Sequence, residues 1–149
     1  MRRGTDILVV DERDTPVAAI EVKNRANLSA SEASGIRRNL FTHGLSGPVD
    51  YFLVVSQDVG YLWGPTKRDA VGVDPDLRFP MSPVVARYAV EPSASGRLME
   101  SQLELLVSSW IQELTGSMSP IEDEPELSLE RAGLTSALRR GRVVTEAVL

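Results

Sequence analysis

The chain has 149 residues, 42% hydrophobic and 25% charged, as is typical of a soluble protein with room for one packed domain over residues 1–149. It contains no cysteine, which excludes a disulfide framework and a thiolate metal site. The net charge of −5 argues against a strongly basic nucleic-acid coat, and no apolar run suits a membrane span or a signal peptide. We therefore expect a cytoplasmic protein that makes no membrane contact.

The first predicted elements are a β-hairpin and a helix. Residues 7–10 and 17–23 are rich in β-branched and apolar residues and flank a polar turn, which predicts two strands. Residues 29–43 predict a helix, because Ser29 and Glu32 have the spacing of a capping box.

The rest of the chain continues as strands and then helices. Residues 50–56 form an unbroken apolar run that predicts a central strand packed by the helix over 29–43. The other predictions are a short strand at 60–64, irregular structure over 65–96 with a short strand or helix near 83–90, a helix at 97–114, an exposed acidic linker at 115–126, a helix at 127–141 interrupted at Gly133, and a final strand at 142–149.

Three charged residues lie in or beside the hairpin strands, where an unpaired charge is costly to bury. Glu21 and Lys23 are two residues apart and so point to the same side of a strand. If Val10 pairs with Val17, the same register places Asp6 opposite Glu21, with Cβ atoms roughly 5 Å apart. A slip of one residue would instead place Asp6 on the wrong face.

Two carboxylates this close repel each other unless a cation lies between them. Mg²⁺ or Mn²⁺ suits such a site, because hard cations take oxygen ligands and keep several waters. Lys23 would then lie beside the metal, where it can hold a water or stabilise charge on a phosphate. The arrangement predicts metal-assisted hydrolysis of a phosphodiester, with Asp6, Glu21 and Lys23 as the catalytic residues. The alternative is an edge hairpin with ordinary solvated charges.

Asp6 followed by Glu21-Val22-Lys23 resembles the D…(D/E)xK signature of the PD-(D/E)xK nucleases, the restriction-endonuclease-like superfamily. The order hairpin, helix, strand and short strand over residues 5–64 is also similar to that family's core. The resemblance implies an α/β fold with a mixed sheet flanked by helices. It also implies Asp6, Glu21 and the Val22 main-chain carbonyl as metal ligands, and Lys23 as the catalytic lysine.

The chain departs from the family at its start. Thr5 replaces the family's proline, which is a mild change. The family also has a helix and a strand before this aspartate, but only five residues precede Asp6 here. This front element is absent, is supplied by the C-terminal helix and strand (97–149), or lies in sequence outside this chain. The possibilities include a homodimer or a partner that supplies the missing element.

Basic residues near the motif are candidates for nucleic-acid binding. Arg37 and Arg38 on the predicted helix could reach phosphates, although a solvated helix face is an equal alternative. Arg25 could touch a substrate backbone, although an ordinary loop is the favoured interpretation. The leading hypothesis is a Mg²⁺-dependent nuclease acting on nucleic acid, with DNA favoured over RNA. The competing hypothesis is a catalytically silent nuclease-like fold that serves as a protein-interaction or assembly module.

Overall fold

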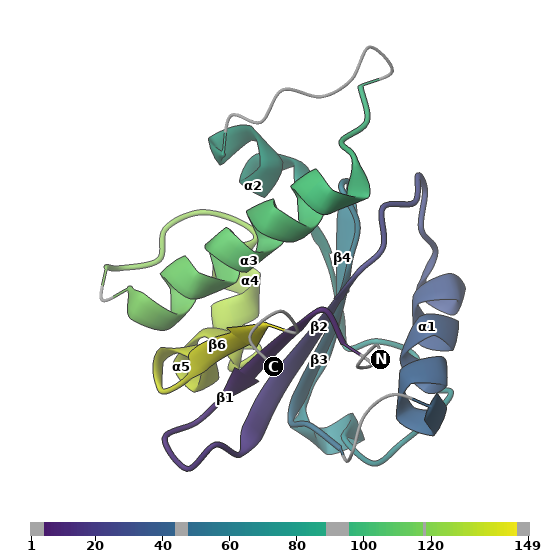
Figure 1. Ribbon diagram of the computed structural model, residues 1–149, viewed down its shortest axis with the longest axis vertical. Helices are drawn as coiled ribbons and strands as arrows, with labels where there is room; N and C mark the ends of the chain where they lie inside the picture. Colours follow the sequence, from purple (N-terminus) through teal and green to yellow (C-terminus); the bar gives the residue numbers. More distant parts are fainter. Residues whose placement is uncertain (1–4, 44–47, 89–95, 118, 146–149) are drawn as a thin grey trace.

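The computed structural model describes residues 5–43, 48–88, 96–117 and 119–145. Within them, six strands form a mixed sheet with helices on both faces (Figure 1). The strands lie in the order β5–β4–β3–β2–β1–β6 and comprise β1 Ile7–Val10, β2 Pro16–Val22, β3 Tyr51–Val55, β4 Val59–Trp63, β5 Leu77–Pro80 and β6 Arg142–Thr145. The helices are α1 Ala30–His43, α2 Ser82–Arg87, α3 Glu100–Gly116, α4 Glu126–Arg131 and α5 Leu134–Arg139, with a 3-10 turn, η1, at Pro65–Lys67. The fold is of the α/β class, as predicted.

The predicted hairpin forms, and its register is nearly the expected one. β1 and β2 pair antiparallel, with Ile7 opposite Ile20 and the next two residues in the same register. The expected pair Val10–Val17 is wrong in detail, because Val10 faces Pro16 across an irregularity after Val9. Such a bulge shifts the register only beyond that point, so the predicted register holds at the other end of the hairpin.

The strand β3 lies at the centre of the sheet, as its apolar run predicted. It pairs in parallel with β2 and antiparallel with β4. The helix α1 packs on it, with the rings of Phe41 and Phe52 edge to face at 5.8 Å. The capping box at the start of α1 is also confirmed: the Ser29 N–H donates to Glu32 Oε1 at 3.0 Å, and the Glu32 N–H donates to Ser29 Oγ at 3.1 Å.

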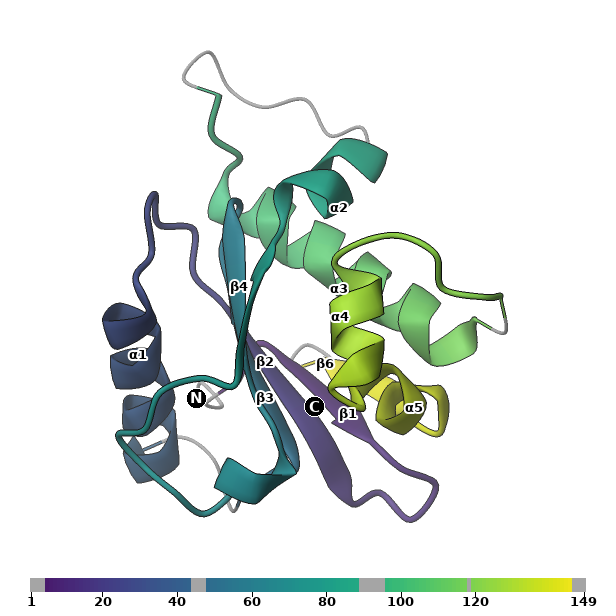
Figure 2. The same ribbon diagram turned by 180° about the vertical axis from the view of Figure 1, so that it is seen from behind.

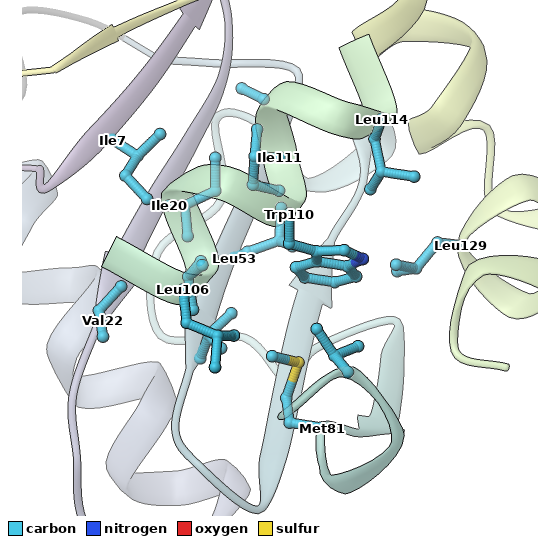
Figure 3. Close-up of a cluster of buried hydrophobic side chains, with 14 of the residues drawn as sticks. Ile7, Ile20, Val22, Leu53, Met81, Leu106, Trp110, Ile111, Leu114 and Leu129 are labelled. Carbon is cyan, nitrogen blue, oxygen red and sulfur yellow. The ribbon is translucent and has the colours of Figure 1, made fainter. Parts of the chain in front are cut away.

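The sheet separates two hydrophobic cores. The α1-side core holds the buried residues Ala19, Leu28, Ala33, Val49, Phe52, Val54, Val59, Tyr61 and Trp63. The α3-side core is larger, and Figure 3 shows part of it, with Leu106, Trp110 and Ile111 of α3 beside the sheet residues Ile20 and Leu53. Figure 2 shows α2, α3, α4 and α5 on the side of the sheet opposite α1. Among the described helices, none combines the length and apolar character needed to cross a membrane.

The C-terminal segment joins the same sheet. β6 pairs antiparallel with β1, with Ile7 opposite Thr145, on the edge that β2 does not occupy. This confirms the predicted final strand over 142–145, and residues 146–149 of that prediction lie outside the described residues. Within the region 65–96, α2 confirms the short element predicted near 83–90, whereas β5 was not predicted. The predicted exposed linker also ends in a buried residue, since Glu126 begins α4 and is 6% exposed.

One strand contact depends on a glycine. Gly60 of β4 lies opposite Phe79 of β5, and a Cβ atom at this position would be 2.2 Å from Phe79 Cζ. Phe79 is buried, so its ring has little room to move. We therefore expect Gly60→Ala to lower the free energy of unfolding by about 1–3 kcal/mol through overpacking.

The matched control is Gly35→Ala in α1, where an added Cβ meets nothing within 4 Å. That change should raise the free energy of unfolding by about 0.5–1 kcal/mol, because glycine is a poor residue in a helix interior. Urea unfolding of both variants measures the difference. If Gly60→Ala and Gly35→Ala had equal free energies of unfolding, the Phe79 ring would move aside at no cost.

Candidate functional site

The hairpin register brings two of the predicted site residues to one face of the sheet. Along β1 and β2, Ile20 faces the α3-side core, whereas Leu8 and Ala19 face the α1-side core. The observed pairing begins at Ile7 and Ile20, and Asp6 precedes β1 in a bend; a continuation of the same register would set Asp6 opposite Glu21 on the α1 side.

The segment before β1 is held to β2 by side chains. Asp6 Oδ2 accepts a hydrogen bond from the Val22 N–H at 2.8 Å. Thr5 is buried, and its hydroxyl donates to the Ile20 carbonyl at 2.9 Å. From the sequence, Thr5 is only a mild departure from a family motif. In the structure its hydroxyl ties the main chain next to Asp6 to β2.

The main chain of Val22 is directed toward Asp6. The next residue, Lys23, donates its N–H to the Val55 carbonyl on β3, at 2.9 Å. Successive residues of a strand direct their N–H and C=O groups to opposite sides, so those of Val22 point to the β1 side. The Val22 carbonyl, one of the predicted metal ligands, therefore points to the same side as the Asp6 carboxylate.

Glu21 and Lys23 form an ion pair at the end of β2. Lys23 Nζ lies 3.4 Å from Glu21 Oε2, which confirms that the two side chains share a side of the strand. Glu21 is only 3% exposed, whereas about a third of the lysine side chain is open to solvent. Withdrawal of the carboxylate from water strengthens its attraction to nearby cations. The lysine ammonium, in contrast, can reach a molecule at the surface.

The residue after the lysine anchors this end of β2 to α3. The Asn24 N–H donates to Glu100 Oε1 at 3.3 Å, and its side-chain amide donates to the Leu98 carbonyl. Asn24 Oδ1 accepts from Arg97 Nη2 at 2.7 Å. Asn24 lacked a recognisable signal because its partners lie more than 70 positions further along the chain.

The three arginines proposed for nucleic-acid binding have different environments. Arg25 is exposed, with Nη1 3.9 Å from Glu32 Oε2 in a loose ion pair, and Arg38 is exposed on α1. Arg37 is 1% exposed and lies in the protein interior instead of on the surface where a phosphate could reach it. Its guanidinium donates to the carbonyls of Lys67 and Ala70, each at 2.7 Å.

Aromatic rings surround the rest of the Arg37 guanidinium. Its central carbon lies 4.4 Å from the ring centroid of Phe41 and 5.3 Å from that of Trp63. Burial lowers the pKa of Arg37, and the nearby Asp76 carboxylate opposes that shift. A side chain held in this way stabilises the fold, so Arg37 does not belong to a surface that could contact nucleic acid.

Two aromatic residues of β4 and a basic residue of β6 have partners within the fold. The Tyr61 hydroxyl donates to the Leu28 carbonyl at 2.8 Å, and Trp63 Nε1 donates to the Val73 carbonyl at 3.0 Å. Both rings belong to the α1-side core. Arg142 pairs with Asp14 of the hairpin turn.

Neither the side chains of the described residues nor comparisons with known proteins identify a metal centre or a family. Across the described ranges, no three His, Cys, Asp or Glu side chains form a group that could hold a metal ion. A site here would therefore use two carboxylates and main-chain oxygen. Comparisons with protein-family models, curated proteins and solved structures return no significant match.

Proposed function

We propose that this protein is a metal-dependent nuclease that hydrolyses phosphodiester bonds in nucleic acid, with DNA as the favoured substrate. The observation that carries the proposal is the ion pair of two predicted residues at the end of β2, next to the point where Asp6 is anchored. The Lys23 ammonium lies 3.4 Å from the Glu21 carboxylate, and Asp6 accepts a hydrogen bond from the N–H of Val22, the residue between them. The sequence resemblance to the PD-(D/E)xK nucleases assigns catalysis to the same three residues.

The chemistry of these groups fits a hard divalent cation. Asp6 and Glu21 offer carboxylate oxygens, and the Val22 carbonyl points to the Asp6 side. Mg²⁺ and Mn²⁺ accept such oxygen ligands and retain several waters, so a small set of protein ligands suffices. When bound, the ion would supply an activated water and neutralise charge on the phosphate.

The chain's own residues have separable roles in this proposal. Asp6 is fixed by the Val22 N–H, and Glu21 supplies a negative charge that is shielded from water. Lys23 would place its ammonium beside a phosphate oxygen, where a positioned donor stabilises the charge that develops in the transition state. Asn24 would keep the lysine in place by holding the end of β2 to α3.

The placement of the C-terminal strand supports a complete core. The family resemblance requires a helix and a strand before the aspartate. Here β6, which follows α3, α4 and α5 in the chain, pairs with β1 at the sheet edge beside the aspartate strand. The C-terminal segment thus offers the strand, and helices, that the N-terminal part of the motif core lacks. Arg25 and Arg38 are exposed and available for phosphate contacts.

Divalent-ion binding tests the proposal independently of activity. We expect Mg²⁺ or Mn²⁺ to raise the melting temperature of the wild type, since an ion at 100 times its Kd stabilises the folded state by about 2.7 kcal/mol. Glu21→Gln should remove most of that rise by deleting one ligand charge. The control is Glu12→Gln, which removes an exposed carboxylate from the hairpin turn and should leave the rise unchanged.

Cleavage assays complete the test. Plasmid, single-stranded DNA and RNA are incubated with each ion, and Asp6→Asn serves as the inactive variant. Metal-dependent cleavage that Asp6→Asn lacks would support the nuclease. If the wild type shows neither cleavage nor an ion-dependent rise in melting temperature, the silent interaction module replaces the nuclease as the better explanation.

A further inference from the structure

A cavity of about 170 Å³ lies on the side of the sheet opposite α1. It is bounded by α2, by the C-terminal half of α3, and by the segment that leads into α4. Figure 2 shows these three helices together, away from α1. Asp6, Glu21 and Lys23 do not line the cavity, so its function is independent of the proposed nuclease site.

The charges around this cavity are strongly unbalanced. Among the described residues that line it, one is a cation, Arg87, and four carry carboxylates: Glu113, Glu122, Asp123 and Glu126. Trp110, Leu114 and Ile121 add apolar surface to the same walls. A cavity with both features favours a ligand that has a cationic head and an aliphatic stem.

The Glu126 carboxylate has one oxygen that lacks a hydrogen-bond donor among the described residues. Its side chain is 7% exposed, and a single oxygen, Oε2, accepts both the Arg87 Nη2 donor at 2.7 Å and the Trp110 Nε1 donor at 2.8 Å. Within the described residues, no donor reaches the other oxygen, Oε1, which is also closed to bulk water. A buried carboxylate oxygen without a donor is costly, so an N–H group brought in by a ligand would be stabilising.

The Glu126 carboxylate would have to turn for the ligand to reach it, because Oε1 is closed to solvent and Oε2 is held by Arg87 and the buried Trp110. The terminal bond of a glutamate side chain has a broad rotational preference, so a modest turn of the Glu126 carboxylate would direct an oxygen into the cavity. Arg87 can follow such a turn, because nearly half of its side chain is exposed.

We propose that this cavity binds an alkyl cation, an ammonium or guanidinium group on an aliphatic stem. The head would donate to the Glu126 carboxylate, and the stem would lie against Trp110 and Leu114. The same chemistry is offered by a small free amine and by a lysine or arginine side chain of a peptide. Anions are disfavoured, because four carboxylates would repel them.

Calorimetric titration of the full chain tests the proposal with defined probes. These are n-butylammonium chloride for a free amine and N-acetyl-lysine methylamide for a peptide side chain, at fixed ionic strength. N-acetyl-norleucine methylamide has a similar aliphatic stem without the charge and serves as the neutral control. We expect saturable binding of at least one cationic probe and none of the norleucine compound. The tighter of the two cationic probes identifies the source of the ligand.

Substitutions locate the binding in this cavity. Glu126→Gln should weaken binding at least about tenfold, as expected for loss of a charge-assisted hydrogen bond. Because Glu126 also holds Arg87 and Trp110, its loss could unfold the protein, so Glu113→Gln at the cavity wall is tested in parallel and should weaken binding several-fold. Thermal melting checks that each variant is folded, and Glu12→Gln on the distant hairpin turn controls for net charge.

Two results would overturn the proposal. One is the absence of saturable binding of both cationic probes at millimolar concentration. The other is binding to folded Glu126→Gln or Glu113→Gln with wild-type affinity, which would place the cation elsewhere on this acidic protein.

Discussion

Replacement of Lys23 by alanine should reduce metal-dependent nuclease activity by about 10²–10³, the usual loss when one positioned donor is removed from a transition state. Its ammonium lies 3.4 Å from the Glu21 carboxylate and is partly exposed, so it can reach both the carboxylate and a bound phosphate. The free energy of unfolding should change by about 1 kcal/mol or under, since the lysine side chain is 35% exposed and solvent screens its charge. Nicking rates and thermal melts of the same preparations measure both effects.

The ion pair also predicts a change in the metal affinity of this variant, which a nuclease assay alone would not reveal. Without the lysine ammonium, less positive charge lies beside the Glu21 carboxylate, so Lys23→Ala should bind Mg²⁺ or Mn²⁺ more tightly than the wild type. The control is Arg13→Ala, which removes an exposed cation from the hairpin turn and should cleave at about the wild-type rate. A Lys23→Ala variant that cleaves as fast as the wild type would remove the lysine from the mechanism.

The largest effect on stability is expected for Arg37→Ala. This change deletes two 2.7 Å hydrogen bonds and leaves the carbonyls of Lys67 and Ala70 without these donors. It also removes a side chain packed against Phe41 and Trp63. With charge-assisted bonds at about 1.5–3 kcal/mol each, offset by the relief of a buried charge, we expect a loss of about 3–4 kcal/mol in the free energy of unfolding.

The neighbouring residue provides the matched control. Arg38→Ala removes the same side chain from the exposed face of α1 and should change the free energy of unfolding by about 0.5 kcal/mol or less. Urea unfolding followed by tryptophan fluorescence compares the two. If the two variants have equal stabilities, the interior contacts of Arg37 contribute nothing net.

The sequence predicted the parts of this fold that depend on local periodicity. Alternation along the strands gave the correct faces for Ile20 and Glu21, since a strand has a two-residue repeat. The register that sets Ile7 opposite Ile20 followed from the short hairpin. The bulge beside Val10 could not be predicted, because nothing in the apolar pattern marks where an extra residue is inserted.

The errors concern charged residues whose environment is set by distant segments. Arg37 and Arg38 are adjacent and identical in type, so nothing in their residue types distinguishes them. The spacing of Ala33 and Arg37 on the helix was the available signal, since both face the α1-side core. Glu126 was assigned to an exposed linker because acidic runs are usually solvated, yet Arg87 and Trp110 bury it.

The pairing of β6 with β1 has a consequence for folding kinetics. β1 is synthesised before its partner strand β6, which lies more than 130 positions further along the sequence. Until that long-range contact closes, β1 is an edge strand whose main-chain groups can pair with another molecule. The hairpin that bears Glu21 should thus acquire its β6 neighbour late, and a nascent chain that has not yet added residues 142–145 should aggregate more readily than one that includes them.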